Sequence, residues 1–441
     1  MDIIIAGAGK VGFELARSLS NSHQVILIDQ NESALERLGE LVDIYPVVGN
    51  IEDPATFAKL PDSQADIFIA VTDSDEANLL ATLLVDDKVA IKRKIIRLKN
   101  SYFAKSSLLN NLENLHSVFP YQLVADTMKL LIKYPEANNV KEFTNTNMKL
   151  ISAKVNNIDH EEKFVGLFEN KSLKIVALER DKEMIIPNRE DMVLHGDLIY
   201  FLGSGEVLKK IYAELDIGMP HQIKNVVIFG ADRLGVEIAN AISSDNLSIK
   251  MIEKDLALCE RASEILQDRA LIINSHYDET ILYSEENLVD ADIMISTDRQ
   301  DESNIIRALQ AQENGIKKII AINNEKKYYP LMHQLGIAVA RGPQTNAYYS
   351  ILEYLSASET TLPKHFCGGK GVIYSKKITN DDRSIGKLLP NWAHDDAIIL
   401  VERDKYFIPY GETITIHEND IIYISTKSEN EEKAKRWIES L

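Results

Sequence analysis

The chain repeats its landmarks at a fixed distance of 223 residues. Four pairs keep this spacing: Gly7 and Gly230, Gly12 and Gly235, Asp181 and Asp404, and Asp197 and Asp420. A single register held over the whole length indicates a tandem duplication. The length of 441 residues is enough for two to four domains. We therefore predict a larger lobe and a smaller lobe, each occurring twice, over residues 1–135, 140–220, 223–358 and 363–441.

The first lobe opens on a glycine motif between a strand and a helix. Ile3-Ile4-Ile5 has the β-branching of a buried strand, and helical spacing begins at Lys10. Gly7-x-Gly9-x-x-Gly12 lies between them. In dinucleotide-binding folds the first glycine allows the tight turn, the second lets a pyrophosphate approach, and the third lets the helix pack closely. The helix N-terminus then offers N–H groups to phosphate.

An acidic residue follows at the spacing that such a motif requires. The predicted strand Val25–Ile28 ends on Asp29, 17 residues after Gly12. A carboxylate near this distance bonds the adenosine ribose in dinucleotide-binding folds. The alternative is a strand, turn and helix with incidental glycines and an N-capping Asp. Agreement of strand, glycines, helix and acid favours the dinucleotide interpretation.

Strands and helices continue to alternate through the first lobe. The expected strands are Ile44–Val48, Ile67–Val71 and Ile95–Leu98, and the expected helices are Ser33–Leu41, Asp75–Val85 and Tyr121–Ile132. This alternation predicts an α/β fold whose parallel sheet is covered by helices on both faces. Loops at the carboxyl ends of the strands then form one crevice, where such folds bind ligands. The predicted fold is a tandem duplication of a Rossmann-like nucleotide-binding domain and a small α+β lobe.

The smaller lobe has a different pattern. Its expected strands are Lys149–Val155, Ile175–Leu178 and Leu198–Leu202, and its expected closing helix is Val207–Leu215. Gly218 and Pro220 make Asp216–Gln222 the candidate linker to the second half. That half restarts with the strand Asn225–Phe229.

Composition narrows the classes of partner. The formal net charge of −18 argues against nucleic acid and against adhesion to anionic lipid. It suits a basic partner such as the cytoplasmic loops of a membrane protein, although a negative charge also simply keeps proteins dissolved. The two cysteines, Cys259 and Cys367, show no zinc or disulfide spacing, and the ten histidines are scattered. We expect no metal site, no direct membrane insertion and a cytoplasmic location.

The motifs together resemble one family. They are Gly7-Ala-Gly-Lys-Val-Gly12, Val71-Thr-Asp-Ser-Asp-Glu-Ala-Asn78, Arg97 in IIRLKN, and Glu253-Lys-Asp255. With the repeat, they resemble the TrkA family of Trk potassium-uptake regulatory subunits, built from two tandem "regulator of K⁺ conductance" (RCK) units. The resemblance implies NAD⁺/NADH or adenine-nucleotide binding and a homo-oligomer, either a dimer or a tetramer ring. It also implies peripheral attachment to the inner face of the plasma membrane through a Trk-type K⁺ channel subunit.

The resemblance also implies site residues in the first lobe. Phosphates would lie on Gly7, Ala8, Gly9, Lys10, Val11 and Gly12, the ribose on Asp29, and the adenine near Gly49 and Asn50, with Thr72, Asp73 and Arg97 lining the crevice. Thr72-Asp73 could also cap a helix, a role compatible with binding. Arg97 could instead form a surface salt bridge, and Lys10 could be either a phosphate contact or a solvated lysine.

The second lobe departs from the pattern. Its matching residues are Gly230, Arg233 and Glu253, but Asp232 replaces the middle glycine. A carboxylate there disfavours a dinucleotide, although Arg233 could partly offset its charge. Either this lobe binds a mononucleotide such as ATP or ADP weakly, or it is structural, which we favour. We also match Thr72-Asp73 and Asn78 with Thr297-Asp298 and Asn304, displaced by a couple of residues.

The sequence favours a regulator over an enzyme. A dehydrogenase needs a proton-transfer group beside the nicotinamide and usually a sizeable substrate domain. No His/Asp or Tyr/Lys constellation stands out, and each small lobe has only about 70–80 residues. The main expectation is NAD in the first lobe, with ATP or ADP left open. An NAD-dependent oxidoreductase of a small metabolite and a regulator of another transporter, such as an antiporter, are the alternatives.

Overall fold

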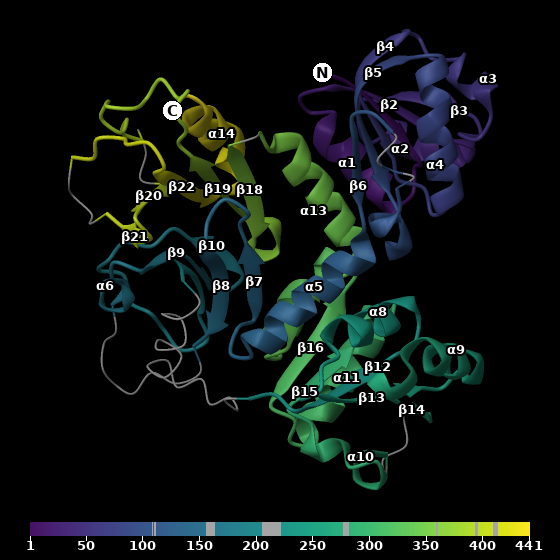
Figure 1. Ribbon diagram of the computed structural model, residues 1–441, viewed down its shortest axis with the longest axis vertical. Helices are drawn as coiled ribbons and strands as arrows, with labels where there is room; N and C mark the ends of the chain where they lie inside the picture. The colour runs from purple at the N-terminus through teal and green to yellow at the C-terminus, as the bar shows by residue number, and fades with distance from the viewer. Residues whose placement is uncertain are drawn as a thin grey trace. The chain divides into compact units, whose positions relative to one another are not determined.

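The protein consists of two compact units. The computed structural model describes residues 1–107, 109, 112–155, 164–204, 222–276, 282–358, 360–392, 396–408 and 413–441. Residues 1–125 and 341–352 form one unit, and residues 126–340 and 353–441 form the other. Figure 1 shows the elements of each. The division into four domains stays a prediction.

The first unit contains a six-stranded parallel sheet in the order β3-β2-β1-β4-β5-β6. Its strands are β1 (Asp2–Ala6), β2 (Gln24–Asp29), β3 (Tyr45–Val48), β4 (Gln64–Ala70), β5 (Ala90–Arg97) and β6 (Leu115–Val118). This is the Rossmann order, in which the crevice opens at the carboxyl ends of β1 and β4. The predicted fold class is confirmed. The strand β6 was not expected, because its sequence LHSV is short and contains polar residues.

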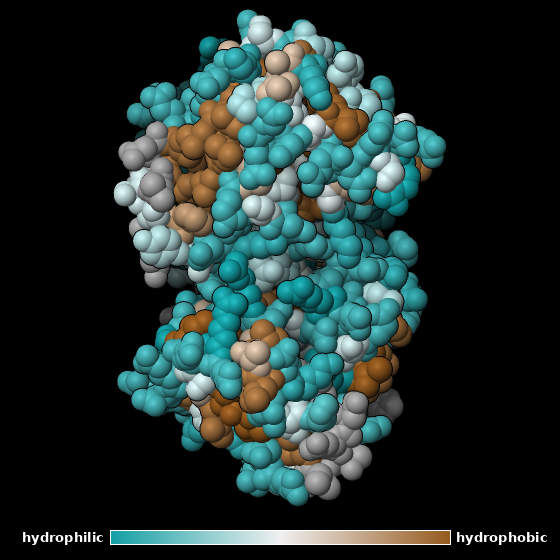
Figure 2. All heavy atoms as spheres, turned by 90° about the vertical axis from the view of Figure 1, so that its right-hand side faces the viewer, coloured by the Kyte–Doolittle hydropathy of each residue, from teal (hydrophilic) through white to brown (hydrophobic). Residues whose placement is uncertain are grey.

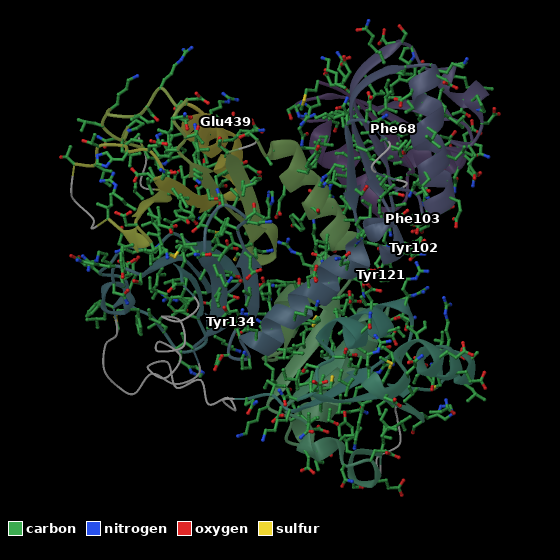
Figure 3. All side chains as sticks on the ribbon, viewed as in Figure 1. Phe68, Tyr102, Phe103, Tyr121, Tyr134 and Glu439 are labelled. Carbon is green, nitrogen blue, oxygen red and sulfur yellow. The ribbon has the colours of Figure 1, made fainter. Side chains whose placement is uncertain are left out.

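Helices cover both faces of this sheet. They are α1 (Lys10–Leu19), α2 (Glu32–Gly39), α3 (Pro54–Phe57) and α4 (Asp75–Leu84), together with the first part of α13 (Pro343–Ser356) and of α5 (Pro120–Lys133). Alternate residues of β1 point to opposite faces. Ile4 packs in one cluster with Ala77 and Ala81 of α4, whereas Ile5 faces Gly12 of α1. Phe68 of β4, labelled in Figure 3, belongs to the Ile4 cluster.

The second unit repeats the parallel sheet in the order β14-β13-β12-β15-β16-β17. Its strands are β12 (Asn225–Phe229), β13 (Ser248–Glu253), β14 (Leu271–Asn274), β15 (Ile293–Ser296), β16 (Lys318–Asn323) and β17 (Ala338–Arg341). Its helices are α8 (Arg233–Ile242), α9 (Leu256–Leu266), α10 (Leu282–Glu285), α11 (Asp301–Glu313) and α12 (Tyr329–Gln334). The expected duplication therefore extends to the topology.

The two small lobes are antiparallel sheets in the orders β10-β9-β11-β8-β7 and β18-β19-β22-β20-β21. The first has β7 (Asn139–Glu142), β8 (Lys149–Lys154), α6 (Val165–Phe168), β9 (Leu173–Arg180), β10 (Glu183–Ile185) and β11 (Leu198–Gly203). The second has β18 (Thr361–Phe366), β19 (Gly371–Lys377), β20 (Ala397–Arg403), β21 (Tyr406–Phe407), β22 (Ile421–Lys427) and α14 (Glu431–Glu439). The expected helix Val207–Leu215 and nearly all of the linker Asp216–Gln222 lie outside the described residues.

The two small sheets share one hydrophobic core. Each small lobe contributes one phenylalanine to the other. Phe143 of the first small lobe packs edge-on against Tyr423 of the second small lobe, with 6.0 Å between ring centroids. Phe366 of the second small lobe packs against Tyr200 of the first small lobe, with 5.0 Å between ring centroids. Each phenol also bonds a buried carboxylate of its own sheet, and Tyr423 donates to Glu402 at 2.6 Å. Each small sheet thus gains a second half-core from the other.

The repeated ERD motifs have a structural cause. Arg180 donates two hydrogen bonds to Asp197, at 2.8 and 2.7 Å, and Arg403 does the same to Asp420 at 2.8 Å each. Both aspartates are almost fully buried. A bidentate pair fixes both partners, and losing one would leave a buried charge without compensation. The ERD motif and its partner aspartate therefore recur in both small lobes because each small sheet is held by this buried ion pair.

The structure corrects one part of the proposed repeat. Thr72 N and Asp298 N each donate to the amide oxygen of the asparagine six residues later, at 2.9 Å. Val71 N and Thr297 N bond to the last residue of the central strand in their own sheets. Thr72 therefore matches Asp298, not Thr297. The match of Asn78 with Asn304 is right, because each accepts from one backbone N–H and donates to two backbone carbonyls at equivalent positions.

The shared core predicts a specific cost for one hydroxyl group. Tyr423→Phe removes one hydrogen-bond donor from Glu402, which also accepts a bond from Thr146 at 2.8 Å. We expect the free energy of unfolding to fall by about 1–3 kcal/mol, because a buried acceptor loses a partner. Chemical denaturation measures this loss. Tyr406→Phe, at a 56% exposed position, is the matched control and should change nothing; equal effects of the two variants would contradict the prediction.

Candidate functional site

The first glycine loop, residues 7–12, is built around one close approach. A Cβ on Gly12 would lie 1.8 Å from the carbonyl oxygen of Gly7, so α1 can meet β1 only with glycine at this position. Gly7 has φ of +111°, which L side chains rarely adopt. At Gly9 a Cβ would meet no atom within 4 Å. The middle glycine therefore faces open space, as a phosphate-binding loop requires.

Asp29 holds this loop from the end of β2. Ala8 N donates to one of its carboxylate oxygens at 2.6 Å, and Asn31 N donates to the other at 2.8 Å. Asn31 in turn caps α2. The carboxylate thus orders the glycine loop and the start of α2, and its half-buried position leaves one side toward the crevice.

A cavity of about 280 Å³ lies at the carboxyl ends of the strands of the first unit. Of the expected site residues it is lined by Gly7, Asp29, Gly49, Asn50, Thr72 and Asp73, and its other lining residues are Ile28, Gln30, Ile51, Glu52, Ser74 and Ala77. The loops after β1, β2, β3 and β4 therefore meet as the Rossmann topology predicts. Ala8, Gly9, Lys10, Val11, Gly12 and Arg97 are not among the lining residues, and Gly9 and Lys10 are exposed at the start of α1.

Gly49 and Asn50 shape the wall beside Asp29. Gly49 N donates to the carbonyl oxygen of Asp29 at 3.0 Å. A Cβ on Gly49 would lie 2.5 Å from the side chain of Thr56, whose hydroxyl donates to the carbonyl of Asn50. The Asn50 side chain accepts from Glu52 N at 3.0 Å, which folds the loop into a turn. These contacts place Asn50 at the cavity, and its contact with an adenine stays a prediction.

Arg97 lies beneath the crevice. Its side chain is only 5% exposed, and it donates to Asp73 at 3.1 Å. Lys99 lies 3.3 Å from the same oxygen. Partial burial alone would raise the pKa of Asp73, but Arg97 and Lys99 hold it below its usual value. Arg97 therefore forms the salt bridge considered for it, but from a buried position and to an exposed carboxylate. Direct contact between Arg97 and a ligand stays a prediction.

Two buried side chains fix the crevice without lining it. Asn78 joins β4 to β5, since it bonds the backbone of Thr72 and donates to the carbonyl of Arg97 at 2.9 Å. Asp75 accepts from Lys99 N and Asn100 N at 2.7 and 2.9 Å. The sequence places both residues in the motif after β4, but it gives no sign of which backbone groups they bind.

The second glycine loop, residues 230–235, keeps the backbone conformation of the first, but the side chain of Asp232 occupies the N-terminus of its helix. Gly230 has φ of +110°, and a Cβ on Gly235 would lie 2.0 Å from the Gly230 carbonyl oxygen. Asp232 accepts from Leu234 N and Gly235 N at 3.0 and 3.3 Å, so its carboxylate caps α8. Burial raises the pKa of Asp232, although these two N–H groups oppose the rise. In α1, Gly9 makes no side-chain cap.

Glu253 of the second lobe is equivalent to Asp29 and accepts three backbone hydrogen bonds, whereas Asp29 accepts two. It accepts from Ala231 N at 2.9 Å, and from Lys254 N and Asp255 N at 2.8 and 3.0 Å. Only 5% of it is exposed. Arg233 is exposed at the start of α8, and Arg299 lies 3.6 Å from Asp232. The carboxylates of this lobe thus bind its own backbone and side chains.

Among the residues that the structure describes, no helix is long and apolar enough to cross a bilayer. Within the same residues, no group of three or more His, Cys, Asp or Glu side chains is arranged to hold a metal ion.

Both glycine loops lie in regions that match one family model. The TrkA-N domain model matches residues 3–114 and 226–343, which is more than half of the chain. The chain belongs to the TrkA-N family. It is 28% identical to a "Trk system potassium uptake protein TrkA homolog" of Archaeoglobus fulgidus, covering 98% of this chain and 99% of that one. It is 27% identical to the "Trk system potassium uptake protein TrkA" of Haemophilus influenzae, covering 95% and 96%.

Solved structures show the same fold. The "GsuK RCK domain" crystal structure superposes with a TM-score of 0.61 at 18% identity, covering 100% of this chain and 95% of that one. The structure titled "GsuK channel bound to NAD" gives 0.62 at 17% identity, covering 100% and 79%. At such low identity these matches concern the fold alone. The resemblance to the TrkA family seen in the sequence is confirmed by the family model and by these relatives.

The close approach at Gly12 yields a stability prediction. Gly12→Ala places a methyl group against the Gly7 carbonyl, and we expect a loss of about 1–3 kcal/mol in the free energy of unfolding, as for overpacked cores. Gly39→Ala in α2 is the control, because its Cβ would meet nothing within 4 Å and alanine favours helix. Thermal or chemical denaturation compares the two. If Gly12→Ala is as stable as the parent, the approach of α1 to β1 does not depend on glycine.

Proposed function

We propose that the protein is a regulatory subunit that binds NAD⁺ or NADH in its first lobe and thereby controls a Trk-type K⁺ channel. The single observation that carries the proposal is the open first glycine loop, held by Asp29 beside a cavity. The relatives named as Trk potassium-uptake proteins support the transport role. An RCK neighbour of the same fold whose title describes bound NAD supports the ligand.

The geometry supports nucleotide binding in the first lobe rather than in the second. In α1 the first-turn N–H groups have no side-chain cap, whereas in α8 Asp232 accepts from two of them. A pyrophosphate needs these N–H groups and would meet the negative charge of Asp232. The second lobe is then a structural copy whose anion site is filled by its own carboxylate.

Asp29 favours ligands with a free ribose 2′-hydroxyl. A carboxylate at this place accepts hydrogen bonds from the ribose and repels a 2′-phosphate, so NAD is preferred to NADP. The ribose of ATP or ADP fits Asp29 equally well.

Control of the channel follows from differential binding. A nucleotide that fits one arrangement of the subunit better shifts the population toward it, by no more than its difference in affinity between the arrangements. We place the protein on the cytoplasmic face of the membrane, held there by basic loops of the channel subunit that its net charge of −18 complements.

Self-assembly is part of the proposal. Hydrophobic side chains gather in patches on the face drawn in Figure 2. Leu80 and Leu83 of α4 are 39% and 52% exposed, and Ile306, the residue of α11 that matches Leu80, is 56% exposed. Apolar residues repeated at matching positions of both lobes suit a homo-oligomer in which α4 and α11 are buried by neighbouring subunits.

Grafting the second loop's carboxylate onto the first tests the ligand. Gly9→Asp meets no atom within 4 Å and can cap α1 as Asp232 caps α8, so stability should be kept or slightly raised. Binding of NADH and NAD⁺ should fall at least about tenfold, because losing roughly 1.4 kcal/mol already has that effect. Isothermal titration calorimetry with NADH, NAD⁺, ATP and ADP measures it.

Gly9→Ala is the matched control, since it adds the Cβ without the charge and should bind more tightly than Gly9→Asp. Asp29→Ala should also abolish binding, but it frees Ala8 N and so disturbs the loop as well. Binding that survives in Gly9→Asp would exclude the first loop as the phosphate site. Steady loss of NADH absorbance with a small metabolite would point instead to an oxidoreductase. K⁺ flux through the reconstituted channel that ignores nucleotide would contradict gating.

The oligomer has its own test. Leu83→Glu should lower the mass measured by light scattering at a fixed protein concentration, because a charge would have to be buried between subunits. Leu41→Glu, at a position 68% exposed after α2, is the control and should leave the mass unchanged. An unchanged mass in Leu83→Glu would exclude α4 from the interface.

A further inference from the structure

A buried histidine in the second small lobe lies between two carboxylates that belong to different helices. His365 of β18 is 3% exposed. Its ring Nε2 lies 3.1 Å from an oxygen of Glu431, in the first turn of α14. Its ring Nδ1 lies 3.7 Å from an oxygen of Glu353, near the end of α13, and its backbone N donates to that oxygen at 3.0 Å.

Other charged and titratable groups face this triad from each neighbouring element. Lys364 of β18 lies 3.2 Å from the second oxygen of Glu353, and Lys141 of β7 also acts on Glu353. Tyr374 of β19 donates to Glu431 at 3.2 Å, with Glu432 of α14 close by. Glu353 therefore has two lysines near it, whereas Glu431 has a phenol and a second acid. The charge of His365 matters most to Glu431.

The protonated imidazole is the form that this geometry suits. Imidazolium has two N–H donors and can face both carboxylates, whereas neutral imidazole has only one. Burial alone would lower the pKa of His365, but its bonds with Glu353 and Glu431 raise it above the ordinary value. Because the pKa is higher in the folded state, the stabilisation is complete below about pH 6.5 and is lost as the pH rises through the folded value.

The helix that the triad holds also bonds to α1, near the end of α1 that lies away from the first glycine loop. Glu353 lies on α13, a continuous helix from Pro343 to Ser356, whose residues 343–352 belong to the first unit. There the hydroxyl of Tyr348 is hydrogen-bonded to Ser18 of α1. The N-terminus of α1 is the phosphate-binding end of the glycine loop. Residues of α13 therefore bond both to His365 and to Ser18 of α1, the helix that begins at the first glycine loop.

We propose that Glu353, His365 and Glu431 form a proton-operated clasp on the end of α13. Protonated, it fixes α13 to β18 and α14; deprotonated, it releases one carboxylate and lets the helix end move. Through α13 and α1 the clasp makes the affinity of the first lobe for nucleotide depend on pH, and this second part rests on the proposed function. The chain would then sense alkalinity as well as nucleotide.

The clasp itself is tested without nucleotide. The ring of His365, assigned in NMR spectra by its loss in His365→Gln, should titrate above the ordinary value of about 6.5. The Tm of the full chain should fall more between about pH 6 and pH 9 than that of His365→Gln. The control is His195→Gln, at an exposed turn position, which should keep the parental pH dependence. Titration at or below the ordinary pKa, or equal pH dependence in parent and His365→Gln, would overturn the clasp.

A second variant keeps the test decisive if His365→Gln does not fold. Glu431→Gln keeps the shape and removes one charge, so the pKa of His365 should fall; an unchanged pKa would overturn the proposal. Coupling is then measured by calorimetry with NADH, whose Kd should rise at least about fivefold from pH 6 to pH 9 in the parent and stay flat in the clasp variant. Equal slopes would refute the coupling alone. Absence of NADH binding at every pH would refute the proposed function, while the NMR and Tm results still decide the clasp.

Discussion

The architecture depends on one hydrogen bond, from the backbone N–H of the glycine loop to a carboxylate at the end of the second strand. Ala8 N makes it to Asp29, and Ala231 N makes it to Glu253. The bond ties the turn after the central strand to its neighbour, so the loop stays open above the sheet with its helix close behind. Both halves of the duplication keep this bond, although only the first half has a glycine loop without a side-chain cap. The acid therefore has a structural role in both copies, separate from the ribose contact proposed for Asp29.

The two copies differ in what caps the helix N-terminus that follows the glycine loop. A helix N-terminus that begins at a glycine turn attracts negative charge, and the protein can meet that demand with a ligand or with a side chain. Asp232 meets it from within α8. Gly9 leaves it unmet in α1. A single side chain thus separates the lobe proposed to bind nucleotide from a self-capped lobe, while the two parallel sheets keep the same topology. Duplication allows this, because one copy can specialise in stability while the other keeps the costlier open site.

Sequence reasoning predicted the parts of this fold that backbone geometry enforces. Glycines at positive φ, the acid that ends β2 and the 223-residue register are each demanded by local geometry, so the sequence displays them directly. Long-range partners were out of reach. Nothing in the local pattern says that Arg97 turns to Asp73, or that Phe143 packs on Tyr423 of the other small lobe. The mistaken match of Thr72 with Thr297 has the same origin. The second copy has extra residues between its glycine motif and its crevice, and only the hydrogen bonds show which residues are equivalent.

The small lobes extend the same argument to regulation. Position 142, which matches His365 at the distance of the repeat, is a glutamate that pairs with Lys149 of the neighbouring strand. The histidine and its two carboxylates therefore belong to the second copy alone, as the open glycine loop belongs to the first. One helix, α13, carries both Tyr348, which bonds to Ser18 of α1, and Glu353, which bonds to His365. Under the proposals made above, the proton and the nucleotide would act on different copies and would influence one another through α13.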